Sequence, residues 1–178
     1  MKAQLTIQYL ASFIFFIGLV VYVYFAYSAN LPKYVEEVEK EDIRSKAYLL
    51  SELLVNNPGE PSNWDEIIPQ NWKRLGFADQ HSLKQNLILK SKIDKFNEEF
   101  DCSDRSNFTR LQQLVGIDRP FSFFIFNISW EDGSGDRLPL IECIPPMMVK
   151  EEINVTIRRI VAYNDSGSIK LAELVLQM

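Results

Sequence analysis

Two cysteines, Cys102 and Cys143, are the side chains best suited to covalent chemistry in this chain. Their thiols can remain free, as in an ordinary cytosolic core, or they can form one disulfide. In an oxidising compartment, a bridge between them closes a long loop and stabilises the fold by about 2–4 kcal/mol. The extracytoplasmic location predicted from the N-terminal segment favours the disulfide.

Four of the eleven asparagines begin the glycosylation tripeptide Asn-x-Ser/Thr: Asn107, Asn127, Asn154 and Asn164. Each single match is a weak signal, but four are more than composition alone leads us to expect. We predict that some of them carry glycans. Asn164 is expected to be the most accessible because it lies in a predicted turn, whereas Asn127 and Asn154 lie in predicted strands and must point outward.

Side chains that could support catalysis or bind a metal are scattered. His81 is the sole histidine and has no second His or Cys at metal-ligand spacing, so we interpret it as an exposed loop residue. The Gly133-Ser134-Gly135 segment is typical of a turn between strands rather than of a phosphate-binding loop. Adjacent acidic pairs are typical of solvated faces: Glu36-Glu37, Glu98-Glu99 and Glu151-Glu152. The sequence therefore predicts no enzyme, no metal site and no cofactor.

The charge balance argues against a nucleic-acid partner. The 178 residues carry 24 acidic and 19 basic side chains, and no Lys/Arg run is interleaved with aromatic residues. Once the N-terminal segment is set aside, the remaining length suits about one ordinary domain.

A long apolar run near the N-terminus predicts a membrane partner. No charged side chain occurs between Tyr9 and Ala29, and about 20 residues of helix match the hydrocarbon thickness of a bilayer. We interpret residues 5–28 as a membrane-spanning helix. Tyr22, Tyr24 and Tyr27 crowd its far end, where aromatic rings favour the membrane–water interface. A buried core helix is the alternative, but such a helix needs a polar face that this run lacks.

Charges on either side of the run predict its orientation. Lys2 precedes it, and five acidic residues follow within residues 36–42, so the positive-inside rule places the N-terminus in the cytoplasm and residues 30–178 outside. Secretory cleavage after Tyr27-Ser28-Ala29 is a second interpretation, in which the outer part is a secreted binding domain.

The residues before the run carry a family resemblance. Gln4, Thr6 and Gln8 follow Met-Lys-Ala, and this arrangement resembles archaeal type IV pilin-like proteins with a class III signal peptide. The resemblance implies that residues 1–3 are a short leader, which a prepilin-type peptidase removes by cutting between Ala3 and Gln4. It also implies that residues 4–29 form the assembly helix that packs with homologous pilin subunits.

Two residues depart from the family pattern of Gln-x-Ser-x-Glu followed by Leu four residues later. Gln8 replaces the acid and Ser12 replaces the leucine. The family's carboxylate is thought to meet the free amine of a neighbouring subunit in an apolar bundle, where an unpaired charge is costly. Gln8 can accept a hydrogen bond but cannot neutralise that amine. This departure therefore favours a minor or accessory subunit over a self-polymerising one.

Three later segments extend the resemblance, which covers residues 1 to about 130. They are Pro58-Gly59-Glu60-Pro61-Ser62-Asn63-Trp64, Arg74-Leu75-Gly76-Phe77-Ala78 and Lys92-Ile93-Asp94-Lys95-Phe96-Asn97. Their order carries the likeness, since no single motif is specific. Without the family, the segment from Pro58 to Asn63 is a helix stop and turn cluster.

The segment 30–57 is predicted to be an amphipathic helix. Val35, Val38, Ala47, Leu50 and Leu54 recur at multiples of three and four residues between charges, which gives one apolar stripe. Pro32 either kinks the helix or begins a new one. A shorter helix is predicted over residues 107–115, capped by Ser106 or Asn107 and ended by Gly116.

Strand-like patterns follow Gly116. Strands are predicted over residues 120–130, 138–144, 153–157 and 169–176, and the last two form an antiparallel hairpin around a turn at residues 164–167. Residues 58–178 are thus an extracytoplasmic α+β head, and the fold class is α+β with a long N-terminal helix packed on an antiparallel sheet of about four strands, as in pilins. Trp64, Trp72 and Trp130 are core anchors or, alternatively, adhesive residues.

Three functions remain open at this point, one of them the secreted binding domain described above. The leading prediction is a pilin-like subunit of a surface filament, which Gln4 and Thr6 favour. The alternative is a single-span anchored surface protein whose head binds a ligand or partner, which Gln8 and Ser12 favour.

Overall fold

The computed structural model describes residues 2–80, 84–128, 137–146 and 155–178, with side-chain detail from Tyr9 onward. The chain forms two compact units, Met1–Glu41 and Asp42–Met178. Several predicted features lie outside the described residues: His81, Trp130, Gly133-Ser134-Gly135, Glu151-Glu152, Ile153 and Asn154.

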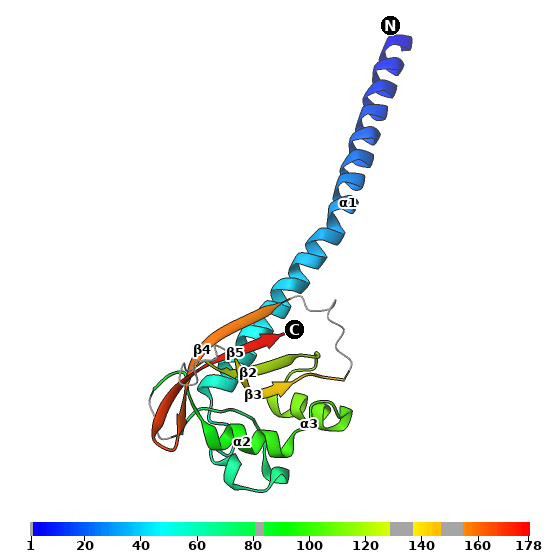
Figure 1. Ribbon diagram of the computed structural model, residues 1–178. Helices are drawn as coiled ribbons and strands as arrows, with labels where there is room; N and C mark the ends of the chain where they lie inside the picture. The colour runs from blue at the N-terminus through cyan, green and yellow to red at the C-terminus, as the bar shows by residue number, and fades with distance from the viewer. Residues whose placement is uncertain (1, 81–83, 129–136, 147–154) are drawn as a thin grey trace. The chain divides into compact units, whose positions relative to one another are not determined.

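The first unit is helical over all of its described residues. Helix α1 is continuous over Lys2–Asn56, includes Pro32 and so extends through the first unit and into the second (Figure 1). Within the described chain, it is the helix long and apolar enough to span a membrane, and none of its apolar window is buried. The sequence explains this exposure. The stretch that begins at Tyr9 has no polar face, so the helix cannot pack one side on a core and turn the other toward water.

The second unit contains the end of α1 and four shorter helical segments. These are the 3-10 helices η1 (Trp64–Glu66) and η2 (Pro69–Asn71) and the α-helices α2 (Lys90–Glu99) and α3 (Arg105–Val115). Asp104 caps α3 by accepting a hydrogen bond from the Asn107 amide at 3.0 Å, so the predicted caps Ser106 and Asn107 were wrong. Gly116 ends the helix as predicted, at a φ of 72° that suits glycine.

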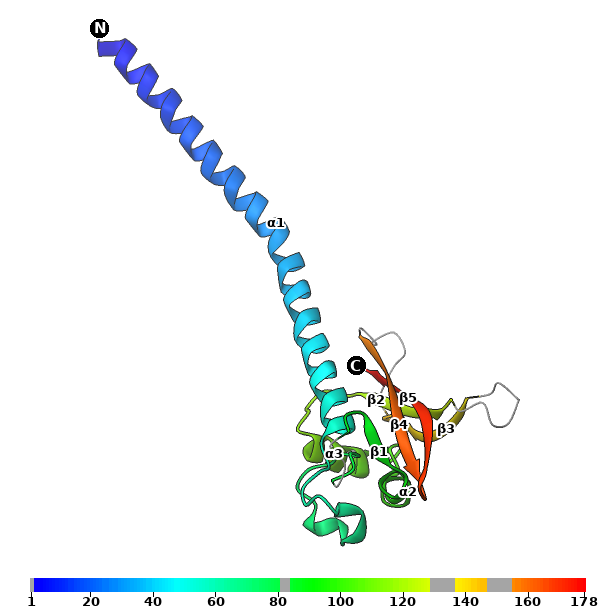
Figure 2. The same cartoon turned by 90° about the vertical axis from the view of Figure 1, so that its left-hand side faces the viewer.

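A mixed five-stranded sheet forms the other layer of this unit (Figures 1 and 2). The strand order is β1-β4-β5-β2-β3, with bounds β1 (Leu87–Leu89), β2 (Ser122–Asn127), β3 (Leu138–Cys143), β4 (Thr156–Asp165) and β5 (Ser168–Gln177). The β2, β3, β4 and β5 strands pair antiparallel, as predicted, whereas β1 pairs with β4 in parallel and was missed. Strand β1 has three residues, too few to show an alternating pattern.

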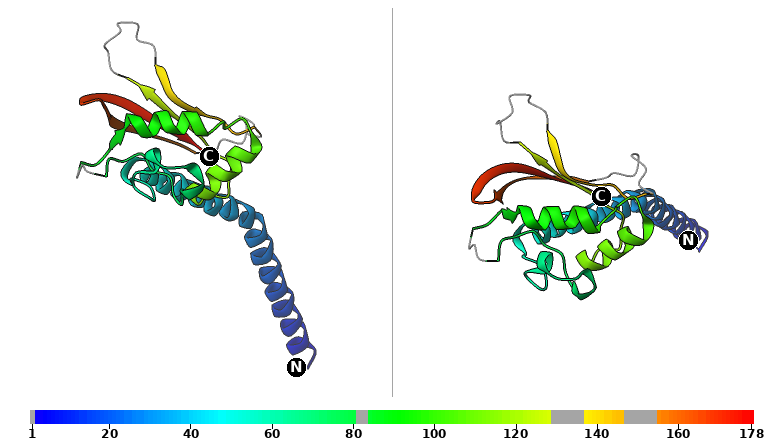
Figure 3. Two further views of the ribbon diagram at one scale, coloured as in Figure 1. Left: turned by 90° about the horizontal axis from the view of Figure 1, so that it is seen from below. Right: turned by 60° about the horizontal axis from the view of Figure 1, so that its bottom comes forward.

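The helices lie over one face of the sheet (Figure 3). Their apolar side chains pack with those of the sheet in one hydrophobic core. Alternation along β2 sends Phe123 and Ile125 into this core, both fully buried. The end of α1 contributes a stripe at helical spacing: Ile43, Ala47, Leu50 and Leu54. The predicted stripe was therefore right for Ala47, Leu50 and Leu54 but wrong for Val35 and Val38, which are exposed.

The predicted disulfide joins Cys102, between α2 and α3, to Cys143 at the end of β3, with Cα atoms 5.2 Å apart. Both residues are buried. The bridge closes a loop with a sequence separation of 41 residues and ties the helical layer to the edge strand of the sheet.

Candidate functional site

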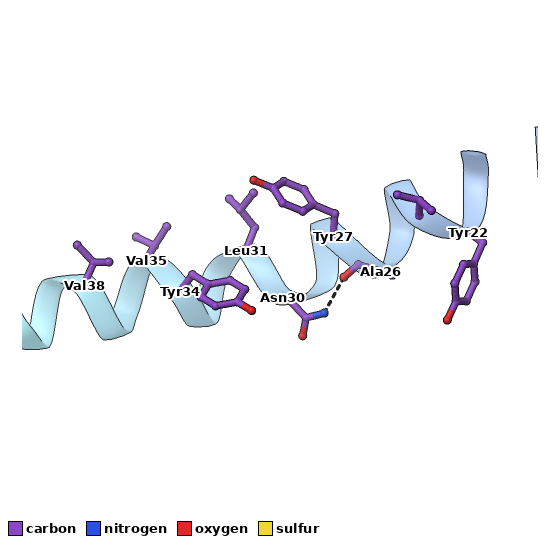
Figure 4. Close-up of a pocket in the computed structure, with 9 residues that line it drawn as sticks. Tyr22, Ala26, Tyr27, Asn30, Leu31, Tyr34, Val35 and Val38 are labelled. Carbon is purple, nitrogen blue, oxygen red and sulfur yellow. Dashed lines mark hydrogen bonds between the residues drawn. The ribbon is translucent and has the colours of Figure 1, made fainter. Parts of the chain in front are cut away.

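A row of mostly apolar and aromatic side chains winds along α1 (Figure 4). Two parallel rows at four-residue spacing compose it: Tyr22, Ala26, Asn30, Tyr34 and Val38, and Val23, Tyr27, Leu31 and Val35. Residues four apart are neighbours on an α-helix but are rotated by about 40°, so the rows turn around the helix as they advance. We call these nine residues the α1 stripe.

The α1 stripe continues past the uncharged run into a charged segment. Leu31, Tyr34, Val35 and Val38 are between 42% and 69% exposed, although Lys33 and several glutamates surround them in the sequence. At 100° per residue, Glu36 and Lys40 fall on the side of the helix opposite these four apolar residues. Lys40 donates a hydrogen bond to Glu36 at 2.7 Å, which lowers the pKa of the Glu36 carboxyl. The segment is therefore amphipathic, with an apolar side that no other part of its own unit covers.

Two polar features sit at the middle of the α1 stripe. The side-chain amide of Asn30 donates to the carbonyl of Ala26 at 2.7 Å, so its polar group is satisfied within the helix (Figure 4). Pro32 has no amide hydrogen and leaves the Ser28 carbonyl without the usual intrahelical donor. The helix nevertheless continues through Pro32, rather than beginning anew there.

The predicted processing residues are Ala3 and Gln4, and the residues of the predicted assembly motif are Gln4, Thr6, Gln8 and Ser12. The first four of these positions along the chain belong to α1, but their side chains lie outside the described detail. Ser12, the other residue of the predicted assembly motif, is exposed on the same helix.

The three segments that carry the later family resemblance meet within the second unit. Backbone hydrogen bonds join Glu60 and Arg74 in both directions, with N–O distances of 2.9 and 3.2 Å. The buried indole of Trp64 donates to the carbonyl of Gly76 at 2.8 Å. Because Trp64 also stacks edge-on against Trp72, with ring centroids 4.8 Å apart, both tryptophans are core residues as the sequence favoured.

Two glycines permit this close approach. Gly59 has a φ of 89°, and a Cβ atom there would strike the Trp64 ring. A Cβ atom at Gly76 would collide with the backbone of Asn57 and Gly59. The turn cluster is therefore packed directly against the segment that follows it, and larger residues do not fit at either position.

Lys92 joins the third segment to the other two. Its ammonium donates to the carbonyl oxygens of Pro58 at 2.6 Å and Ala78 at 2.9 Å, and the residue is 1% exposed. Burial lowers the pKa of Lys92 to about 8, although the charges of Asp65 and Asp79 act in the opposite direction. The spacing of four residues between Lys92 and Phe96 places both on the buried face of α2, which the family resemblance alone does not indicate.

Three of the four glycosylation asparagines are in the described chain. Asn107 lies in the first turn of α3, Asn127 ends β2, and Asn164 lies near the tip of the β4–β5 hairpin. All three are half-buried. The Asn164 side-chain oxygen accepts from the Gly167 amide at 2.9 Å, which leaves its amide nitrogen, the atom that a glycan would modify, outside that bond.

No cluster of three or more potential metal ligands occurs in the part of the chain that the structure describes. No protein-family model, curated protein or solved structure matches the chain.

Proposed function

We propose that the chain is a minor pilin-like subunit of an archaeal type IV pilus or related surface filament. Its α1 helix anchors it in the cell membrane and packs against the helices of homologous subunits, while the α+β unit faces the exterior. A prepilin-type peptidase cuts between Ala3 and Gln4 before assembly. The proposal rests on the resemblance at Gln4 and Thr6 together with the α1 stripe.

The α1 stripe is the observation that carries the assembly role. A simple anchor needs about 20 apolar residues, which the uncharged run already supplies. Leu31, Tyr34, Val35 and Val38 extend the apolar face beyond that run, where the helix carries charges on its other side. An apolar side on an otherwise charged helix is stabilised when a second helix covers it.

A monomeric surface anchor is the second candidate, because Gln8 and Ser12 replace the acid and the leucine of the family pattern. In such a protein, the span holds the head at the membrane and the head acts alone. The two functions differ in whether another copy of α1, or a homologous helix, lies against the α1 stripe.

Cysteine cross-linking in native membranes distinguishes them. Val38→Cys places a thiol on the stripe, and Lys40→Cys places one on the opposite side of the helix as the matched control. The native cysteines do not interfere, since both are in the intramolecular disulfide. We expect a benzophenone-maleimide label on the Val38→Cys thiol to cross-link to a second copy or to a homologous subunit under ultraviolet light, and the same label on Lys40→Cys to give no such product. Equal cross-linking at both positions, or none at either, contradicts the proposal.

A further inference from the structure

A polar hollow of about 540 Å³ lies on the surface of the second unit, between η2 and α3. Its walls include Trp72, Lys73, Gln70, Arg110 and Gln113. None of these residues belongs to the α1 stripe, so a role for the hollow does not rest on the proposed assembly.

Arg110 is held rigidly at this hollow. Its guanidinium lies 5.6 Å from the centre of the Trp72 ring and 5.5 Å from that of the Phe100 ring. One of its terminal nitrogens donates to the Pro69 carbonyl at 2.6 Å. Stacking and this bond fix the plane of the guanidinium before any ligand arrives, which reduces the entropy lost on binding.

The charge of Arg110 has no acidic partner among the described residues. Lys73, which also lines the hollow, pairs with the Glu60 carboxylate at 3.6 Å. Both of those side chains are more than half exposed. Such an exposed pair is weak and gives way easily to another anion. Two cationic side chains, Lys73 and Arg110, therefore line the hollow.

Two side-chain amides at the hollow can form hydrogen bonds with a ligand. The exposed side chains of Gln70 and Gln113 line the hollow and have no hydrogen-bond partner in the described part of the chain. Each amide offers both donors and an acceptor, which hydroxyl groups can use but a phosphate-monoester dianion, having only acceptors, cannot use fully.

We propose that this hollow binds a hexuronate, a sugar that carries a carboxylate beside several hydroxyls. Arg110 takes the carboxylate with its free N–H edge, Lys73 adds a second positive charge, and the two glutamines hold the hydroxyls. The ligand is either a free sugar acid or the terminal residue of a glycan, since both present the same groups.

Ligand-observed NMR and calorimetry with the full chain in detergent test the proposal. The probe is methyl β-D-glucuronide, with methyl β-D-glucoside lacking the carboxylate and acetate lacking the ring. We expect saturable binding of the glucuronide, with a Kd on the order of 1 mM as for a small polar ligand, and at least tenfold weaker binding of the other two. The free acid D-glucuronate shows whether the site also takes an unlinked sugar, and binding of either form supports the proposal.

Variants assign the binding to this hollow. Arg110→Met keeps a long side chain over the two rings but removes the charge, and we expect it to weaken glucuronide binding by about tenfold or more. Arg105→Met is the matched control, since Arg105 is exposed on the same helix and does not line the hollow. Unaltered near-UV circular dichroism confirms that each variant is folded.

Several results would overturn the proposal. No binding of either glucuronide or glucuronate to the folded wild-type chain is one, and acetate or the neutral glucoside binding as tightly as the glucuronide is another. A folded Arg110→Met chain that binds like the wild type, or an Arg105→Met chain that loses binding equally, would also contradict it.

Discussion

The N-terminal unit exposes its apolar side chains, whereas the C-terminal unit buries many of its own in a core. Along α1 between Tyr9 and Val38, large apolar residues are at least 42% exposed, whereas the core of the second unit holds Trp64, Phe77 and Phe123 at 0% exposure. The second unit supplies its own apolar surroundings. The first unit depends on an environment outside the chain, for which a membrane and neighbouring helices are the natural candidates.

Removing a large side chain from each unit gives the strongest test of this contrast. Trp64→Ala loses a buried ring, its contacts with Trp72 and Phe77 and its hydrogen bond to Gly76, and should lower the free energy of unfolding by about 3–5 kcal/mol. Phe15→Ala, at a position 75% exposed, should leave it unchanged. Denaturant titration of the chain in detergent, followed by near-UV circular dichroism, measures both. Equal losses would show that α1 belongs to the same cooperative core.

A pair of glycine substitutions sharpens the contrast at the backbone. At Gly76 a Cβ atom would collide with the backbone of Asn57, so Gly76→Ala should destabilise the second unit by about 2–3 kcal/mol. At Gly18 a Cβ atom meets nothing within 4 Å in the isolated chain, so Gly18→Ala should not destabilise that unit. The same unfolding assay compares them, and a neutral Gly76→Ala would refute the close packing of the turn cluster.

Lys92 gives the second unit a pH dependence that arises from burial. Its pKa is lowered from 10.5 to about 8 by burial, so between these values the unfolded chain binds more protons than the folded one. Stability from this group therefore increases as pH rises through that interval. We expect wild type to gain about 1–2 kcal/mol relative to Lys92→Met between pH 7.5 and 10. A constant difference between the two proteins over this range would contradict the assignment.

The smallest effect is expected where α1 meets the sheet through charge. Arg159 donates to Glu52 at 2.6 Å, and this bond, with one from Asn56, lowers the pKa of the Glu52 carboxyl. The stabilisation is present above the carboxyl's ordinary pKa and is lost as pH falls through the lowered value. Glu52→Gln should cost about 0.5–1 kcal/mol at pH 7 and progressively less toward pH 3. Unfolding curves at several pH values measure it, and a loss independent of pH would exclude an ionic origin.

Local patterns predicted most of the fold. The uncharged run predicted the long helix, alternation predicted the β4–β5 hairpin, and Gly116 marked the end of α3. The turn of that hairpin, Ser166-Gly167, has positive φ at both residues, which matches the turn type that the sequence favours there.

The features that were missed depend on contacts distant in sequence. Strand β1 forms because β4 pairs with it, and three residues carry no pattern of their own. The apolar residues predicted to share one side of the helix over residues 30–57 included Val35 and Val38, which are exposed. Periodicity alone does not reveal which part of a helix packs against a core. Likewise, nothing near Arg110 in sequence indicates that Trp72 and Phe100 stack against it.

The exact mass of the N-terminal peptide, from protein isolated from native membranes, tests the central claim most directly. The account predicts a start at Gln4, with or without cyclisation of that residue, since a prepilin-type peptidase leaves the apolar helix on the mature subunit. A start at Met1 would make α1 an uncleaved anchor, and a start near Asn30 would make the outer unit a secreted domain. Either result would contradict the pilin-like assembly proposed for this chain.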